Sequence, residues 1–149
     1  VINSPKDPWP KSYLRKDNAQ LPPLKDGYFF KGYQLIGKSR MPTFNYNFGQ
    51  LKIIDKPTPK GEADSSEASL IRTITITGEG KDNLYFRAAT GESIELVEEN
   101  TFLINDFAAM NLKSYGKPVL RDLGGNKELL VPIKFINKSA TITQTISWQ

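Results

Sequence analysis

The side chains of this sequence that could do acid–base chemistry are mainly carboxylates. Glu95, Glu98 and Glu99 lie close together, and Asp106 follows a short apolar run. A glycosidase of the common type needs two carboxyl groups across a cleft, about 5–10 Å apart. This spacing does not predict such a pair, because Glu98 and Glu99 precede Asn100 in the pattern of a strand that enters a turn. A carboxylate-only glycoside hydrolase is therefore the least favoured of three functional hypotheses.

The composition excludes most other catalytic centres, because the 149 residues include no cysteine and no histidine. Without cysteine the chain has no thiolate nucleophile and no cysteine-ligated zinc. Without histidine it has no Ser-His-Asp triad, no histidine zinc site and no haem held by histidine. Histidine is also the usual general base near neutral pH. We therefore predict a protein that is not an enzyme and has no cofactor.

Two oxygen-rich stretches, "EADSSE" at 62–67 and "NDF" at 105–107, could offer ligands to calcium. Neither has the pattern of an EF-hand loop, so we interpret both as solvated loops and predict no metal site. The glycines of 78–80 and 124–125 lack the frame of a phosphate-binding loop. They predict hairpin turns instead.

The net charge of +4 is concentrated at the start of the chain, where residues 1–40 contain eight Lys and Arg against three Asp. Phosphate contacts in nucleic-acid complexes use such cations. Here they are scattered among prolines and acids without a basic helix or a nucleic-acid motif, so we predict no nucleic-acid partner. No apolar run approaches the roughly 18 residues that span a bilayer, so we predict no membrane insertion.

Aromatic side chains are the remaining candidates for ligand contact, because sugar-binding sandwiches stack Trp or Tyr rings on sugars. The tyrosines and tryptophans that could build such a platform are Trp9, Tyr28, Tyr33, Tyr46, Tyr85, Tyr115 and Trp148. Most of them alternate with polar residues, which is also the pattern of core aromatics. As candidate ligand-binding residues we name three rings and two cations at a predicted hairpin tip, namely Trp9, Tyr46, Trp148, Lys38 and Arg40.

The elements that must position these residues begin with a segment of five prolines at 1–26. Proline removes a backbone donor and restricts the residue before it, so this segment is predicted to be extended. It could dock on the domain or serve as a linker. From 27 onward the pattern has period two, as in 43–48 and in "LIRTITITG" at 70–78, where Thr and Ile alternate.

Further short runs complete the pattern from residue 51 to the end of the chain. We expect one strand to end at Pro57 and Pro59, and a meander of three strands over 84–106. The one stretch with a plausible helical pattern is 107–116, and Pro132 places the strand of 127–136 at a sheet edge or a bulge. About nine strands with turn signals every 8–12 residues predict an all-β antiparallel sandwich over residues 27–149.

The stretch 28–49 carries Phe30, Gly32, Tyr33 and Leu35, followed by Pro42, Thr43, Phe44 and Tyr46, with "LPPL" before it and "TISW" at the end of the chain. This pattern resembles a segment of large secreted bacterial proteins of the sorbosone-dehydrogenase-like, haem-binding kind, which are common in planctomycetes, verrucomicrobia and bacteroidetes. The resemblance implies a β-sandwich module, without a cofactor of its own, inside a multidomain protein outside the cytoplasm. The family's haem-attachment motif, Cys-x-x-Cys-His, has no counterpart here.

We therefore expect a non-catalytic accessory or interaction domain of a larger secreted or periplasmic bacterial protein. Its expected partners are neighbouring domains of that protein or a carbohydrate. A carbohydrate-binding module is the second hypothesis, and it predicts two or three coplanar exposed rings.

Overall fold

The computed structural model describes residues 5–6, 28–38, 40–62, 65–80 and 83–148. Except for Pro5 and Lys6, the predicted extended segment 1–26 lies outside these described residues, and so does Trp9. The described chain forms eleven strands: β1 (Tyr28–Ile36), β2 (Met41–Phe48), β3 (Leu51–Lys60), β4 (Ser69–Thr77), β5 (Tyr85–Gly91), β6 (Ile94–Glu98), β7 (Thr101–Ile104), β8 (Ala108–Lys113), β9 (Val119–Leu123), β10 (Asn126–Pro132) and β11 (Ser139–Trp148).

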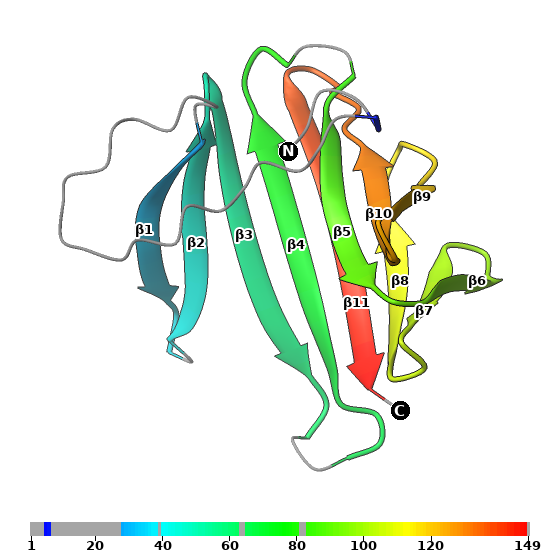
Figure 1. Ribbon diagram of the computed structural model, residues 1–149. Helices are drawn as coiled ribbons and strands as arrows, with labels where there is room; N and C mark the ends of the chain where they lie inside the picture. The colour runs from blue at the N-terminus through cyan, green and yellow to red at the C-terminus, as the bar shows by residue number, and fades with distance from the viewer. Residues whose placement is uncertain (1–4, 7–27, 39, 63–64, 81–82, 149) are drawn as a thin grey trace, which may run out of the picture.

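The strands form two antiparallel sheets (Figure 1). The large sheet has the order β1-β2-β3-β4-β11-β8-β7-β6, and the small sheet has the order β5-β10-β9. The prediction of an all-β antiparallel sandwich is confirmed, with eleven strands in place of about nine. In the described part of the chain, no helix is long and apolar enough to cross a membrane.

The core lies between the small sheet and the large sheet. On β4, Ile74 and Ile76 point into this core, whereas Thr73, Thr75 and Thr77 point to the opposite face. Both residue types are β-branched and suit a pleated strand. The alternation in the sequence therefore correctly assigns the two faces of this strand.

The predicted helical stretch at 107–116 is wrong, because most of it forms β8. Met110 and Leu112 alternate into the core from this strand, and β8 pairs with β11 on one side and β7 on the other. Pairing on both sides satisfies the backbone donors and acceptors that a helix would have satisfied internally. Tertiary pairing thus decides the structure of a segment whose local preference is weak.

The predicted three-strand meander over 84–106 is also wrong in its first strand. Only β6 and β7 continue as neighbours into β8, whereas β5 crosses to the small sheet and pairs with β10. The predicted end of a strand at Pro57 and Pro59 is wrong too, because β3 continues through both prolines to Lys60. Both prolines lie beyond Asp55, the last residue of β3 that pairs with β2, so this part of β3 has β4 as its one strand neighbour.

Pro132, which predicts an edge or a bulge, lies at the end of β10. Although β10 is the central strand of the small sheet, its pairing with β9 ends at Leu130, and a bulge separates Leu129 from Leu130 on the β5 side. The missing donor of Pro132 therefore falls outside the ladder with β9. The predicted turn at 124–125 is confirmed, because Gly124 and Gly125 join β9 to β10 with positive φ angles of 59° and 96°.

Candidate functional site

The small sheet covers only part of the inner face of the large sheet. Its strand β5 reaches β4 and β11, where Phe86 lies by Arg72 and the Ala88 carbonyl meets Gln144. In Figure 1, β1 and β2 extend to the left of β5 and β10. The inner face of β1 and β2 therefore continues past the small sheet.

Aromatic side chains occupy this continuation, which we call the aromatic ledge and define as Phe30, Tyr33, Phe44 and Tyr46. In the β1–β2 register Phe30 is opposite Tyr46, and Tyr33 is opposite Phe44. The ring centroids are 5.2 Å apart in the first pair and 6.1 Å in the second, with interplanar angles of 44° and 51°. Phe30 is 49% exposed and Tyr33 is 61% exposed. The ledge is thus an apolar surface of tilted, mutually packed rings.

A β-bulge places both rings of β1 on this face. Phe30 and Tyr33 are three residues apart, so strict alternation would direct them to opposite faces. The register shifts between Phe30 and Gly32, which inserts an extra residue and restores a common direction. Gly32 has a φ of 107°, a conformation that residues with a Cβ rarely adopt. The bulge that places both rings on one face therefore favours glycine at position 32.

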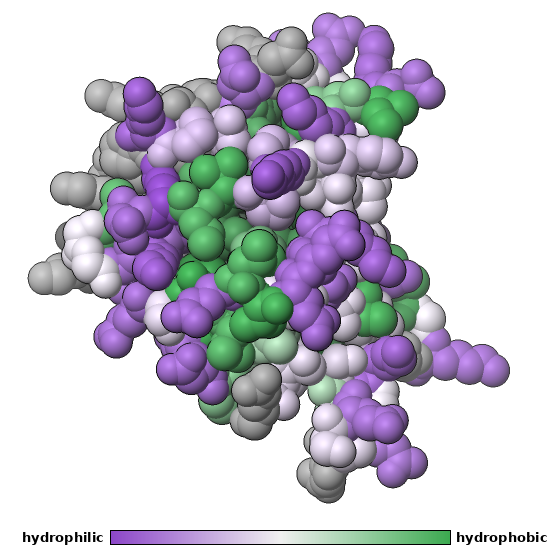
Figure 2. All heavy atoms as spheres, turned by 90° about the vertical axis from the view of Figure 1, so that its right-hand side faces the viewer, coloured by the Kyte–Doolittle hydropathy of each residue, from purple (hydrophilic) through white to green (hydrophobic). Residues whose placement is uncertain are grey.

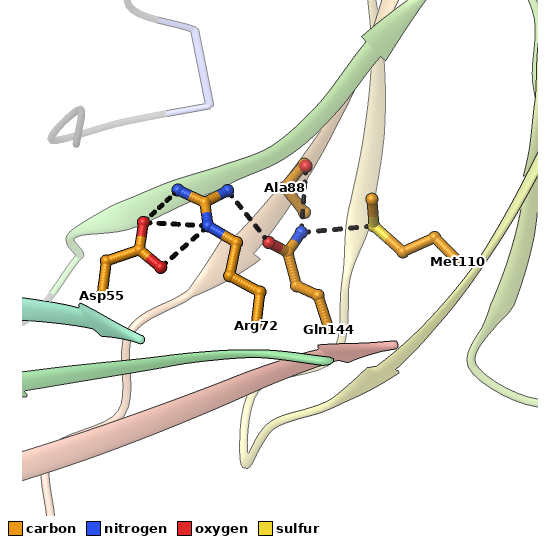
Figure 3. Close-up of polar contacts among 5 residues, drawn as sticks. All are labelled: Asp55, Arg72, Ala88, Met110 and Gln144. Carbon is orange, nitrogen blue, oxygen red and sulfur yellow. Dashed lines mark hydrogen bonds and ion pairs between the residues drawn. The ribbon is translucent and has the colours of Figure 1, made fainter. Parts of the chain in front are cut away.

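A network of polar side chains separates the ledge from the core (Figure 3). Arg72 donates from Nε to both carboxylate oxygens of Asp55 at 2.9 Å, and from Nη2 to Oδ2 at 2.5 Å. Its Nη1 donates to Oε1 of Gln144 at 3.2 Å. The amide nitrogen of Gln144 donates to the Ala88 carbonyl at 3.0 Å and contacts the Met110 sulfur at 3.2 Å. This chain of contacts joins β3, β4 and β11 to β5 in the small sheet.

The network holds Asp55 as a hydrogen-bond acceptor at the inner border of the ledge. The Asp55 side chain is 6% exposed, and its two oxygens face one guanidinium group. Tyr46 lies next to this border, and burial, with a further contribution from the Asp55 charge, raises the pKa of its hydroxyl, while Arg72 opposes the rise. Tyr46 is therefore a neutral hydroxyl at physiological pH, and Asp55 has no free oxygen that could serve as a general base.

A second buried carboxylate lies on the small sheet, on the face turned away from the large sheet. Glu128 accepts from Arg87 at 2.9 Å and from Arg121 at 2.6 Å. Burial raises the pKa of Glu128, but the hydrogen bonds and charges of the two arginines outweigh it, so the pKa lies below its ordinary value. Arg121 also donates to the carbonyl of Pro5 at 2.6 Å, so Pro5 contacts β9.

The structure does not bring the predicted ligand-binding residues together. Tyr46 belongs to the aromatic ledge, whereas Lys38 and Arg40 lie in the exposed turn between β1 and β2. Trp148 ends β11, which β3 and β4 separate from β2, and its side chain is 48% exposed. Trp9 lies outside the described residues. Of the carboxylates considered for hydrolysis, all four are exposed, on β6 or in the turns around β7: Glu95, Glu98, Glu99 and Asp106.

Sequence reasoning missed the combination of Phe30 with Tyr33 and the pair of Asp55 with Arg72. A usable signal exists for the second pair, because each charge interrupts an apolar alternation, after Leu51 and Ile53 and before Ile74. Charges at inward positions need a partner, since an isolated buried charge is costly. The bulge has no comparable signal beyond the glycine itself.

A second exposed apolar surface lies at the other end of the molecule. β6 is an edge of the large sheet and β9 is an edge of the small sheet. Figure 2, which faces this side, shows a hydrophobic band bordered by hydrophilic residues. Exposed aliphatic residues of the two edge strands, which we call the apolar edge, are Leu96, Val97, Val119, Leu120 and Leu123.

Comparison with known proteins gives no relative for this chain. No protein-family model matches it, and neither does any curated protein or any solved structure. The exposed surfaces of the two sheets are therefore the observations from which a function can be inferred.

Proposed function

We propose that this chain is a non-catalytic interaction domain that docks onto another protein through the aromatic ledge. The observation that carries the proposal is the exposure of Phe30 and Tyr33 on a sheet face that the small sheet does not cover. Large exposed apolar patches rimmed by polar groups are typical of interaction sites. The ledge has such a rim in Arg72, whose side chain is 35% exposed.

The ring geometry favours a protein partner over a carbohydrate. A flat sugar platform requires rings that present their faces in one plane, and the paired rings of the ledge are tilted by 44° and 51°. Tilted rings instead leave a ridged surface into which the side chains of a partner can pack. Binding hot spots in protein interfaces are enriched in Tyr, Trp and Arg. The ledge offers Tyr33 and Tyr46, with Arg72 at its rim, whereas the apolar edge is aliphatic.

A non-catalytic role is supported by the state of the two buried carboxylates. Asp55 is held by Arg72, and Glu128 by Arg87 and Arg121. The arginines lower the pKa of Glu128, so this carboxylate offers little basicity to a substrate, and both oxygens of Asp55 accept from Arg72. We extend the proposal to the setting implied by the resemblance of residues 28–49 to secreted bacterial proteins, in which the domain belongs to a larger secreted or periplasmic bacterial protein.

Site-specific photocrosslinking tests this function. A photoreactive phenylalanine analogue at position 33 should form a crosslink to one defined protein in an extract of the source cells. The matched control carries the same analogue at position 115, because Tyr115 is 76% exposed and lies in the loop between β8 and β9. Excess unlabelled chain should compete for the crosslink, whereas unlabelled chain with Phe30→Ala and Tyr33→Ala should not.

Two results would contradict the proposal. The first is equal crosslinking from positions 33 and 115, which would show that the ledge has no preferred protein partner. The second is retention of the chain on a neutral polysaccharide gel that disappears in the Tyr33→Ala variant. That result would assign the ledge to the carbohydrate-binding alternative.

A further inference from the structure

The outer face of the large sheet carries a second regular pattern, made of lysines and hydroxyl groups. We call it the lysine–hydroxyl face and define it by the outward side chains of β3, β4, β11 and β8. Its threonines are Thr58, Thr73, Thr75, Thr77, Thr141, Thr143 and Thr145, and its lysines are Lys52, Lys56, Lys60 and Lys113. The aromatic ledge lies on the opposite face of the sheet, so a role of the lysine–hydroxyl face is independent of docking through the ledge.

The strand register arranges these side chains in rows. Lys56 is opposite Thr73, Thr73 is opposite Thr143, and Thr143 is opposite Lys113. Three strand spacings separate the two lysines of this row, or about 14 Å. Along β3, lysines recur every fourth residue, which corresponds to about 13 Å. The face is therefore an array of hydroxyl groups with lysines about 13 Å apart along β3 and, in the row of Lys56, about 14 Å apart across the strands.

None of the four strands that form this face places a carboxylate on it. Asp55 is the one acidic residue in the sequences of β1, β2, β3, β4, β8 and β11, and its side chain points into the core. None of the four lysines has an ion-pair partner among the described residues. The four exposed lysines thus share a surface whose own four strands carry no outward carboxylate. The outward carboxylates Glu95 and Glu98 of the same sheet lie on β6, which β7 separates from β8.

We propose that the lysine–hydroxyl face binds an anionic polysaccharide, a sugar chain that carries carboxylate or sulfate groups. Charge complementarity selects an anion, and the rows of threonine hydroxyls can donate to and accept from sugar hydroxyl groups. Lysine acts as a hydrated point charge on a flexible stem, which suits anionic groups that recur along a chain. An extended polymer that crosses the strands would meet Lys56, two hydroxyl groups and Lys113 in turn.

The same features disfavour a nucleic acid. A DNA-binding protein commonly makes about 6–10 phosphate contacts, and this face supplies four lysines and no arginine. Binding of single strands relies on aromatic rings that stack on the bases. The outward positions of β3, β4, β8 and β11 contain no aromatic residue; their larger apolar side chains are Ile54 and Ile71. A sugar polymer needs neither feature.

Affinity gel electrophoresis of the full chain tests the proposal, with polygalacturonate and dextran sulfate as anionic probes and dextran as the uncharged reference. We expect retardation by at least one anionic probe, none by dextran, and weaker binding as the salt concentration rises. The double variant Lys52→Gln/Lys56→Gln should bind about tenfold more weakly. Lys117→Gln/Lys134→Gln removes the same charge from two exposed positions away from this face and should stay within about twofold of the parent chain.

A second variant separates the hydroxyl groups from the charges. Thr73→Val/Thr143→Val keeps β-branched side chains and net charge, so it should fold and weaken binding without changing its salt dependence. Thermal unfolding of each variant checks the fold. Absence of retardation by both anionic probes at low salt would overturn the proposal, and so would equal weakening by the two lysine variants. Equal or tighter binding to single-stranded or duplex DNA would reassign the face to nucleic acid.

Discussion

Two regions of the inner face of the large sheet, β4 and β2, differ in what covers them. Both strands alternate apolar with polar residues, as Ile74 and Ile76 do on β4 and as Phe44 and Tyr46 do on β2. The small sheet covers β4, where Ile76 is fully buried, but β2 and its neighbour β1 continue beyond it. The same pattern therefore forms a closed core in one region and an exposed aromatic surface in the other.

This difference shows what periodicity does and does not determine. Alternation assigns a side chain to one face of a sheet, because successive residues of a strand point in opposite directions. Whether that face is then covered depends on the extent of a second sheet built from distant parts of the chain. Here that second sheet has three strands against eight in the first. The surplus width leaves the aromatic ledge available for a partner.

The largest expected effect comes from comparing truncations on the two regions. Ile76→Ala should lower the free energy of unfolding by about 3 kcal/mol, because it leaves a cavity in a covered core. Phe30→Ala removes a larger side chain from the same face of the same sheet, but should cost only about 1 kcal/mol, because half of that ring is already in water. Urea denaturation followed by tryptophan fluorescence measures both values.

Equal losses in these two variants would break the comparison, since they would place Phe30 in an environment as closed as that of Ile76. The two losses can be compared only if the unfolding free energy depends on urea concentration with the same slope in both variants. A different slope indicates a change in the compactness of the unfolded or the native state.

The fold was largely predictable from the sequence, whereas the site was predictable only in part. The hairpin of 28–49 and the two faces of β4 follow from period-two alternation. β8 was not predictable from its own residues, because its pairing with β11 and β7 decided its structure. The ledge depends on the bulge before Gly32 and on the limited width of the small sheet. Local sequence patterns indicate neither the position of this bulge nor the number of strands in the small sheet.

The boundary between the two regions is tested by removing the guanidinium group of Arg72. Arg72→Met leaves Asp55 as a buried carboxylate without its partner and takes a donor from Gln144. We expect a loss of about 2.5 kcal/mol in unfolding free energy, somewhat less than for a fully buried pair because the Arg72 side chain is partly exposed. Denaturation of Arg72→Met, Asp55→Leu and the double variant gives the coupling energy.

The double variant should recover most of the stability that Arg72→Met loses, because it no longer contains an unpaired charge. Additive losses would show that Asp55 and Arg72 do not interact across the boundary. In that case the ledge would be independent of the core rather than continuous with it.

The last comparison concerns Glu128, whose buried carboxylate lies on the small sheet and belongs to neither region. Glu128→Gln keeps the shape of the side chain and one acceptor oxygen for Arg87 or Arg121, so we expect a loss of about 1.5 kcal/mol at neutral pH. The loss should depend on pH. Because the pKa of Glu128 is lower in the folded protein than its ordinary value of 4.5, its ionisation stabilises the fold above that pH.

That contribution disappears as the pH falls from 4.5 through the lower pKa of the folded state, since protonation then removes the charge that the arginines stabilise. The unfolding free energies of the parent chain and of Glu128→Gln should therefore converge as the pH falls, whereas Ile76→Ala should keep its deficit at every pH. A Glu128→Gln deficit that stays constant down to the acid transition would mean that the two arginines contribute through packing alone. The three strands of the small sheet would then be held together by their backbone pairing and their apolar inner face, without help from the ion pairs that Glu128 makes across them.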